Sequence, residues 1–392
     1  MTPRERVLAA FEGRQTDKVP IHNIGFSSQI ASMILGREAY IGGGMQQWRE
    51  AKALWEGKED EFLERSEKDA FDISVALDHD ILRMEYWRMP EKPSRKIDDY
   101  TFLYGDSDKN WRLMRFDPDT ELYQIIDQYP PRMEDTIETI EQSVINQEKS
   151  LEHHHPNPEG PSNVRALMEK YGKNWVVRIG GGGLGIPYGS RVWLEAIALR
   201  PDLIARYLDI QAEIAVRSME GIAATDAKMV FGGGDFASNQ GPFYSPKSFN
   251  ELMLPRLKRI TDSCHKNGLY YLFASDGNLW DVANDLFGNS GVDGFYEIDS
   301  RAGMNLRSLR ERFPHLTLIG NISSVTLHIG TKDDVINETM SCLDEAKKNG
   351  GIIVGVSNYI LPGTPEENLW AMIDTMKKNR EISGNAVSAN RN

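Results

Sequence analysis

An acidic residue follows an uncharged, apolar stretch in the carboxyl-terminal half of the chain. Residues 269–274 are apolar and β-prone, and Ser-Asp-Gly-Asn follows directly at 275–278, which puts Asp276 at the end of the stretch. A run of this kind is typical of a strand that is buried on both faces. A carboxylate where a buried strand opens into a loop could act as a general acid or bind a cation. Asp276 could equally cap the next helix or begin a turn, and this stretch alone does not decide between the two.

Polar and aromatic residues follow the other predicted strands in the same way. In chain order they are His22 and Asn23, then Asp78, His79 and Asp80, then Tyr188, then Asp235, Asn239 and Gln240, then Glu297 and Asp299, then Asn321, and finally Ser357, Asn358 and Tyr359. The carboxyl ends of barrel strands meet at one face, so we expect these side chains to converge, although each alone could be a cap or a loop residue. Carboxylates that close together repel, so at least one should have a raised pKa or bind a cation.

These residues predict a general-acid site or a hard-metal site without a thiolate nucleophile. The predicted catalytic residues are Asp80, Asp235, Asp276 and Glu297.

Eight predicted strands alternate with helices and would position these residues. The strands are expected at 19–24, 71–77, 175–179, 228–232, 269–274, 293–298, 316–320 and 351–356, and the main helices at 2–11, 45–67, 134–148, 201–223, 246–266, 306–313 and 332–348. No Gly-x-Gly-x-x-Gly turn follows the first strand, which favours a TIM (β/α)8 barrel over a dinucleotide-binding sheet. Residues 92–127 predict an antiparallel hairpin inserted after strand two. We expect one domain over 1–380 and a flexible tail over 381–392.

Composition narrows the class of protein. The chain has 392 residues, with 45 Lys plus Arg against 58 Asp plus Glu, so its formal net charge is −13. An acidic surface argues against a nucleic-acid or anionic-membrane partner. The two cysteines, Cys264 and Cys342, are far apart, which fits neither a disulfide framework nor a Cys-rich zinc site. No amino-terminal apolar run or transmembrane span is evident, so we expect a soluble cytoplasmic protein.

Several short motifs resemble, in the same order, those of the uroporphyrinogen decarboxylase superfamily. They are Thr2 to Phe11, Asp17 to Pro20, Asp80-Ile81-Leu82, Ser245-Pro246, Ser275 to Asn278, Ala302-Gly303-Met304, Ile319-Gly320-Asn321 and Leu361 to Pro365. The resemblance spans nearly the whole chain and implies a TIM-type barrel. It also implies one of two activities, because the superfamily contains decarboxylases and methyltransferases that pass methyl groups to or from corrinoid proteins.

The resemblance separates the two activities. It matches Asp80 to the aspartate with which the decarboxylase contacts the pyrroles of its substrate, and Tyr188 to a tyrosine of its site. The decarboxylase's propionate-binding arginines are absent, because residues 24–28 read Ile-Gly-Phe-Ser-Ser, and Asn358 replaces its carboxyl-terminal histidine. A tetrapyrrole with many carboxylates needs fixed cations, so an acidic barrel mouth does not suit it.

The methyltransferases of the superfamily are the other activity that the resemblance implies. The thiol-alkylating members hold zinc with a His-x-Cys motif and a later cysteine, whereas this chain has Ala274, Asp276 and Asn358 at those positions. That zinc site is missing as such, although Asp276 could belong to an oxygen-rich variant. A methyl ether, unlike a thiol, needs its leaving oxygen protonated or polarised, which a carboxylic acid or a metal can do.

We therefore predict a methyltransferase of the O-demethylase type, which moves methyl from a small methoxylated aromatic substrate to a corrinoid on a partner protein. The predicted pocket residues are His22, Tyr188, Phe236, Tyr296, Asn321, Asn358 and Tyr359. A divalent metal such as zinc is a candidate cofactor with unknown ligands, and a homodimer is a candidate assembly. The alternatives are a uroporphyrinogen decarboxylase-like enzyme and a corrinoid- or porphyrin-binding protein without activity; the cluster of acids argues against the second.

Overall fold

Short parallel strands alternate with helices in a mixed α/β fold, described by a computed structural model over residues 1–84, 88–106 and 108–382. One six-stranded parallel sheet has the order β14-β13-β12-β11-β8-β7. Its strands are β7 (Ile179–Gly183), β8 (Met229–Gly233), β11 (Tyr270–Ala274), β12 (Gly294–Tyr296), β13 (Thr317–Ile319) and β14 (Ile352–Ile353). A separate parallel pair joins β1 (Ile81–Leu82) to β6 (Val176–Val177).

An extended segment near the amino terminus lies between β14 and β1. Its Ile21 forms a parallel bridge with Val354, directly after β14. The carbonyl of the same Ile21 accepts a 2.8 Å hydrogen bond from the amide of Asp80, which precedes β1. The first extended segment is therefore bonded to the last parallel strand on one side and to β1 on the other.

Alternation along the strands produces two apolar clusters. One cluster contains Ile24 and at least one residue from each of β1, β6, β8, β11, β12, β13 and β14; its buried members are Val7, Ile24, Ile81, Val176, Met229, Phe231, Leu272, Tyr296, Ile319 and Ile353. We call it the inner cluster. The residues that alternate with these, such as Phe273 and Phe295, belong to a larger cluster that includes the apolar faces of the helices. The strands thus have an inner face to which all the parallel segments except β7 contribute, and an outer face packed against helices.

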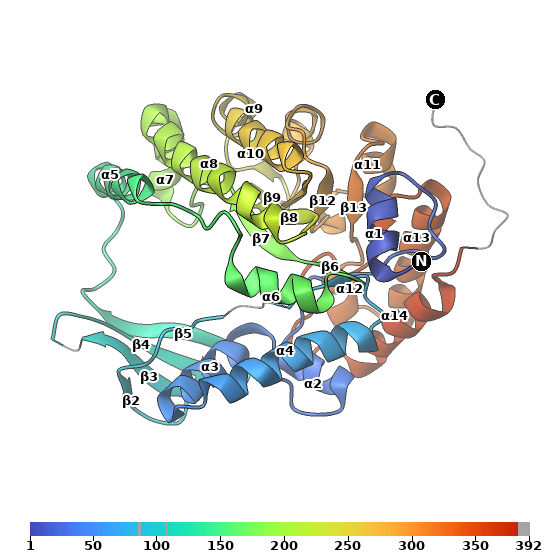
Figure 1. Cartoon of the computed structure of the whole chain (residues 1–392), viewed down its shortest axis with the longest axis horizontal. Helices are drawn as coiled ribbons and strands as arrows, with labels where there is room; N and C mark the ends of the chain where they lie inside the picture. Colours follow the sequence, from blue (N-terminus) through green and yellow to red (C-terminus); the bar gives the residue numbers. More distant parts are fainter. Residues whose placement is uncertain (85–87, 107, 383–392) are drawn as a thin grey trace.

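Helices cover the outer face of the parallel strands, as α8, α10 and α13 do in Figure 1. The α-helices are α1 (Pro3–Phe11), α2 (Ser28–Leu35), α3 (Gly43–Glu56), α4 (Glu59–Ala76), α5 (Ile137–Glu152), α6 (Ser162–Tyr171), α7 (Arg191–Leu199), α8 (Pro201–Ala224), α9 (Pro246–Ser248), α10 (Leu254–Lys266), α11 (Leu306–Arg312), α12 (Ser324–Ile329), α13 (Lys332–Asn349) and α14 (Glu366–Asn379). Among the described residues, no helix is both long and apolar enough to cross a bilayer.

An antiparallel sheet stands apart from the parallel strands, at the lower left of Figure 1. Its order is β2-β3-β4-β5, and its strands are β2 (Arg95–Lys96), β3 (Thr101–Asp106), β4 (Asn110–Asp117) and β5 (Leu122–Tyr129). Phe102, Tyr104 and Phe116 of this sheet are buried with Ala51 of α3 in a small cluster of their own. The segment predicted as a two-stranded hairpin is thus part of a four-stranded sheet with its own core.

Two sequence predictions about elements are wrong. Of residues 71–77, predicted as the second strand, 71–76 belong to helix α4 and Leu77 is its C-cap, and the second parallel strand is β1, which begins at Ile81. The helix predicted over 45–67 is two helices, because Gly57 adopts a left-handed conformation (φ 72°) that ends α3. Of the predicted flexible tail, residues 383–392 lie outside the described residues.

Candidate active site

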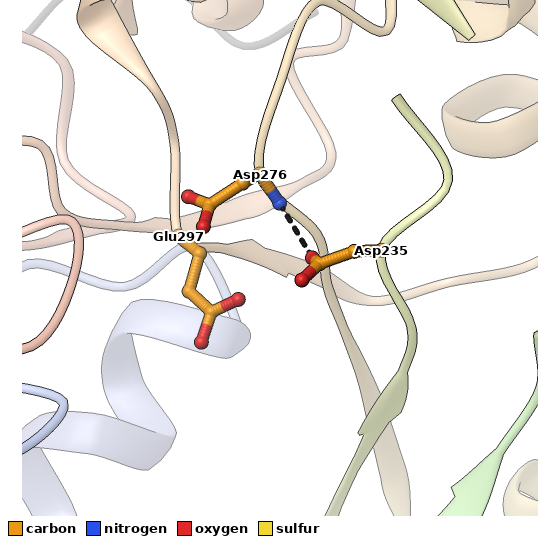
Figure 2. Close-up of side chains that lie close together, drawn as sticks. All are labelled: Asp235, Asp276 and Glu297. Atoms are coloured by element: carbon orange, nitrogen blue, oxygen red, sulfur yellow. Dashed lines mark hydrogen bonds between the residues drawn. The ribbon is translucent and has the colours of Figure 1, made fainter. Parts of the chain in front are cut away.

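Three acidic side chains meet at the carboxyl ends of neighbouring parallel strands. Asp235 lies two residues beyond β8, Asp276 lies two residues beyond β11, and Glu297 directly follows β12. Each offers a carboxylate oxygen, and these oxygens all lie within 4.8 Å of one another. Figure 2 shows the three carboxyl groups converging from three separate segments. We call this group the acidic triad; it contains three of the four residues predicted as catalytic.

Strand register explains why the triad forms. Leu272 belongs to the inner cluster, so the two-residue alternation of a strand carries Asp276 toward the same side. Phe231 does the same for Asp235. Glu297 is out of phase, because Tyr296 occupies the inner cluster and the next residue of a regular strand would face outward. The positive φ of Glu297 (65°) breaks that alternation, and such a backbone conformation in a residue other than glycine is typical of functional sites.

Hydrogen bonds hold two of the three carboxylates. The backbone amide of Asp276 donates to Oδ1 of Asp235 over 3.0 Å. The side-chain amide of Asn358 donates to Oδ2 of Asp276 over 2.5 Å, and Asn358 Oδ1 in turn accepts a 2.6 Å hydrogen bond from the amide of Tyr359. Asn358, a predicted pocket residue, therefore touches the triad directly and orients the carboxyl group of Asp276.

Burial and mutual repulsion make two members of the triad weak acids. Burial, followed by the charges of Asp235 and Asp299, raises the pKa of Asp276 to about 7, although the hydrogen bond from Asn358 acts in the opposite direction. Burial, followed by the charges of Asp276 and Asp235, raises the pKa of Glu297 to about 7, against the opposing charges of Arg178 and Arg83. Asp276 and Glu297 titrate as a coupled pair, so these two carboxyl groups are partly protonated at neutral pH.

The donor set of the triad fits a hard divalent cation as well as a proton. Three carboxylates supply only oxygen atoms, which suit magnesium, manganese or calcium and are accepted by zinc. Both cysteines are buried elsewhere: Cys264 lies against Met219, and Cys342 lies against Asn321. The triad therefore resembles no thiolate zinc site.

The structure places Asp80 away from the triad, which corrects the prediction that it ends a strand at the site. Asp80 precedes β1, at the opposite end of the parallel strands from the triad. It is 1% exposed, and its carboxylate forms ion pairs with Arg6 and with Arg380. Its Oδ2 also accepts a 2.8 Å hydrogen bond from the amide of Ile21. These contacts are those of a buried structural ion cluster.

Three of the predicted pocket residues lie elsewhere. Phe236 is buried in the outer cluster against the rings of Tyr244, Phe249 and Phe273, because it follows the inward-facing Asp235 and so points to the other side. Asn321 donates to the carbonyl of Met304 and faces α13 through Cys342. The hydroxyl of Tyr359 lies against Gly43 at the start of α3.

The other predicted pocket residues lie closer to the triad. Tyr188 is half exposed, stacks on Phe243, and lines an open pocket of about 510 Å³ that also includes Asp235. Tyr296 is a member of the inner cluster, one residue before Glu297. His22 is fully buried beside Tyr296, with a ring separation of 5.8 Å.

Two cations that were not predicted as site residues, Arg83 and Arg178, act on the triad. Both lower the pKa of Glu297 through their charge. Ile81 and Val176 of the inner cluster lie two positions before Arg83 and Arg178, respectively. Strand alternation from these apolar residues could have indicated that both arginines face the inner side. An arginine on the inner side of a short apolar strand is seldom there for packing alone.

The carboxyl-terminal half of the chain is similar to a known protein family. Residues 188–379, which include the whole triad, match the family model described as "Uroporphyrinogen decarboxylase (URO-D)". A uroporphyrinogen decarboxylase from Anaeromyxobacter sp. (strain Fw109-5) is 27% identical over 126 residues, which cover 32% of this chain and 35% of that protein. The matched part is thus about a third of that relative's length.

A solved structure resembles nearly the whole chain in fold. A methyltransferase from Methanosarcina mazei superposes with a TM-score of 0.59 at 18% sequence identity, covering 96% of this chain and 99% of the methyltransferase. At that level of identity the match shows a common fold.

Proposed function

Because the chain belongs to the uroporphyrinogen decarboxylase superfamily, we propose that it is an enzyme that moves a methyl group from a small methoxylated aromatic substrate to a corrinoid protein. The observation that carries this proposal is the acidic triad, in which the pKa of Asp276 and that of Glu297 are raised to about 7. An ether oxygen leaves poorly unless it is protonated or polarised. An acid that still holds its proton near neutral pH can supply that proton.

The roles of the chain's own residues follow from the geometry. The carboxylic acid of Asp276 or Glu297 donates its proton to the ether oxygen while the bond between the methyl carbon and that oxygen breaks. The bonding electrons stay on the oxygen, which leaves as a neutral phenol, and the methyl carbon forms a bond to the acceptor. A reduced corrinoid supplies the nucleophile when its carrier protein is bound. Asn358 keeps the carboxyl group of Asp276 in place during the transfer.

A divalent cation is the alternative way for the triad to act on the same oxygen. The carboxylates of Asp235, Asp276 and Glu297 would hold the ion, and it would supply Lewis-acid polarisation of the ether. Asn358 would then orient one of the ligands. Metal analysis of the purified protein distinguishes this alternative from a purely protonic site.

We further infer that the parallel segments close into an eight-stranded barrel, with the antiparallel sheet as an insertion after its second strand. The inner cluster supports closure, because it draws residues from the Ile21 segment and from the strands on both sides of it. The bridge between Ile21 and Val354 and the hydrogen bond from Asp80 to Ile21 support it as well. In such a barrel the triad occupies the face where catalytic residues are found.

The experiment that tests the proposed function is methyl transfer to cob(I)alamin across a panel of methoxylated aromatic compounds. We expect methylcobalamin and the matching phenol to appear in equal amounts with at least one compound. Metal content is measured on the same preparation. No transfer from any methoxylated aromatic compound, with a folded protein and fully reduced acceptor, would refute the proposal.

The rate of methyl transfer should fall as the pH rises above neutrality. The donor must be protonated, and with a pKa of about 7 the protonated fraction falls about tenfold for each pH unit above that value. The measurement is the single-turnover rate at saturating substrate, from about pH 6 to about pH 9. A metal site predicts the opposite trend, because its carboxylate ligands must be deprotonated to bind the ion. A rate that rises with pH would therefore exclude the protonic mechanism.

Uroporphyrinogen decarboxylation is the second candidate, favoured by the name of the matching family model. We expect negligible coproporphyrinogen formation. Residues 24–28 hold no arginine for propionate groups, and the acidic triad repels a substrate with many carboxylates. The measurement is product formation from uroporphyrinogen under anaerobic conditions. Turnover at about one per second or faster, as is ordinary for enzymes, would reverse the order of the two candidates.

A further inference from the structure

Two arginines lie side by side on neighbouring strands, on the inner side of the parallel segments. The register of β1 and β6 pairs Ile81 with Val176 and Leu82 with Val177, so Arg83 and Arg178 are next in register. The amide of Arg178 donates a 2.7 Å hydrogen bond to the carbonyl of Leu82, which continues the ladder to this point. Because Ile81 and Val176 belong to the inner cluster, the two side chains share its side of the strands.

Arg178 has aromatic neighbours but lacks an acceptor for one of its donors. Its guanidinium carbon lies 4.9 Å from the ring centre of Phe231 and 5.3 Å from that of Tyr296. Its Nη1 is buried and has no hydrogen-bond partner among the described residues. A buried donor that forms no hydrogen bond costs free energy. A planar guanidinium is well suited to bind a carboxylate through paired hydrogen bonds. Arg83 lies beside it, with Nη1 bonded to the carbonyl of Ile24.

A second buried polar atom near these rings also lacks a partner. His22 is fully buried, and its Nδ1 lies 3.1 Å from the carbonyl of Ile81, to which it donates. Its Nε2 is then an acceptor, and it has no partner among the described residues. Burial, followed by the charges of His79, Arg178 and Arg83, holds the pKa of His22 well below its usual range, so the ring is neutral. The inner side thus offers an unused donor and an unused acceptor around Tyr296.

Positive charge is available on the inner side next to the acidic triad. Burial and mutual repulsion raise the pKa of Asp276 and that of Glu297 to about 7, so these two acids are only partly ionised at neutral pH. The arginines act electrostatically on Glu297, so they lie within range of the group that would meet the ether oxygen. One pair of arginines suits one carboxylate, which separates this arrangement from a site for a substrate with many acidic groups.

We propose that Arg178, with Arg83 beside it, binds a carboxylate on the methyl donor while the donor's methoxy group lies at the acidic triad; this rests on the proposed function for the methoxy end of the substrate. The substrate class is then a methoxylated aromatic acid. The rings of Phe231 and Tyr296 lie next to Arg178, where the aromatic ring of such a substrate would stack.

The test measures binding without any corrinoid, using 4-methoxybenzoate and its neutral analogue 4-methoxybenzamide as probes. Isothermal titration of the wild-type chain should show the carboxylate binding roughly tenfold or more tightly than the amide, as expected for a hydrogen bond to a charged group. Arg178→Gln should abolish this preference, and Arg178→Lys should retain part of it, because lysine keeps the charge but loses the paired donors. Thermal melting shows whether each variant is folded.

The matched control is Arg256→Gln. Arg256 is a partly buried arginine of α10 that pairs with Asp209 over 2.9 Å, outside the inner cluster, so its replacement should leave the preference unchanged. Equal binding of the two probes, no binding of either at millimolar concentration, or an unchanged preference in folded Arg178→Gln would overturn the inference. Methyl transfer is scored separately. If methyl transfer is absent while the preference for the carboxylate depends on Arg178, the carboxylate site stands and the proposed function fails. If methyl transfer proceeds while the two probes bind with equal affinity, the proposed function stands and the carboxylate site fails.

Discussion

Replacing Asp276 by asparagine should lower the rate of methyl transfer roughly a hundredfold or more while the chain stays folded, because general acid groups and metal ligands typically contribute that much. The amide has nearly the same shape as the acid, and its oxygen can still accept the hydrogen bond from Asn358. It has no acidic proton for an ether oxygen and is a poor ligand for a cation. The measurement is the methyl-transfer rate with cob(I)alamin, together with thermal melting of the same preparation.

The same variant should gain stability at alkaline pH relative to the wild type. In the folded chain the pKa of Asp276 is about 7, above its ordinary value of 3.8, so the folded chain binds this proton more tightly than the unfolded chain does. Wild-type stability therefore falls as the pH rises between those two values and stays low above them. Asparagine removes this loss, which for a partly exposed carboxyl group is on the order of 1 kcal/mol after solvent screening.

The control for Asp276 is Asp299→Asn. Asp299 lies near the triad, but its Oδ1 accepts hydrogen bonds from the amides of Arg301 and Ala302, a capping role that an amide oxygen can also fill. Its replacement should leave methyl transfer within a few-fold of the wild type. If Asp276 serves only as a cap, Asp276→Asn will instead show near-normal transfer and a loss of about 1 kcal/mol in stability. That pattern would remove Asp276 from the chemistry.

Replacing Asp80 by asparagine should produce the opposite result, a large loss of stability with little change in turnover. Asp80 is bonded to the guanidinium groups of Arg6 and Arg380, and all three side chains are almost completely buried. Removing the shared carboxylate leaves two buried cations with reduced compensation, which typically costs about 3–5 kcal/mol. Thermal or urea unfolding measures the loss, and methyl transfer is expressed per folded molecule.

The control for Asp80 is Asp17→Asn. Asp17 also pairs with Arg6, over 2.7 Å, but its side chain is 42% exposed, so water compensates for much of the loss. We expect about 1 kcal/mol or less from this variant. If folded Asp80→Asn transfers methyl groups a hundredfold more slowly than the wild type, Asp80 acts in catalysis from its buried position and our reassignment of it is wrong.

Local patterns in the sequence predicted the residues of the triad because an apolar run and the acidic residue that follows it are local features. The apolar stretch before Asp276 is strand β11, and Asp235 and Glu297 likewise follow short buried strands without charged residues. Neighbouring residues of a strand point to opposite sides, so Phe236 must face away from Asp235 and could have been excluded from the predicted pocket. The position of Glu297 depends on its left-handed backbone conformation, which the residue pattern in this stretch does not predict.

Asp80 was misplaced because one segment has a pattern that suits two structures. Residues 71–75 alternate apolar and polar side chains as a strand does, yet residues 71–76 form the last turns of α4. There Ala70, Ile73 and Ser74 are buried at helical spacing, while Val75 is exposed. Tertiary packing of the helix overrides the local preference for a strand. Arg83 and Arg178 were missed for a related reason, because their importance depends on the pairing of β1 with β6 across a long stretch of chain.

The ion pair between Asp80 and Arg380 also determines when the chain can finish folding. The two residues are 300 positions apart, so the carboxylate lacks one of its partners until Arg380 has left the ribosome. Until then Arg6 and Asp80 face an incomplete site, and the Ile21 segment lacks the last strand with which it forms its bridge. Contacts of such long range slow folding and expose partly folded chains to aggregation. Newly made chains should therefore stay sensitive to protease until synthesis has passed Arg380, and a chain ended before this residue should remain so.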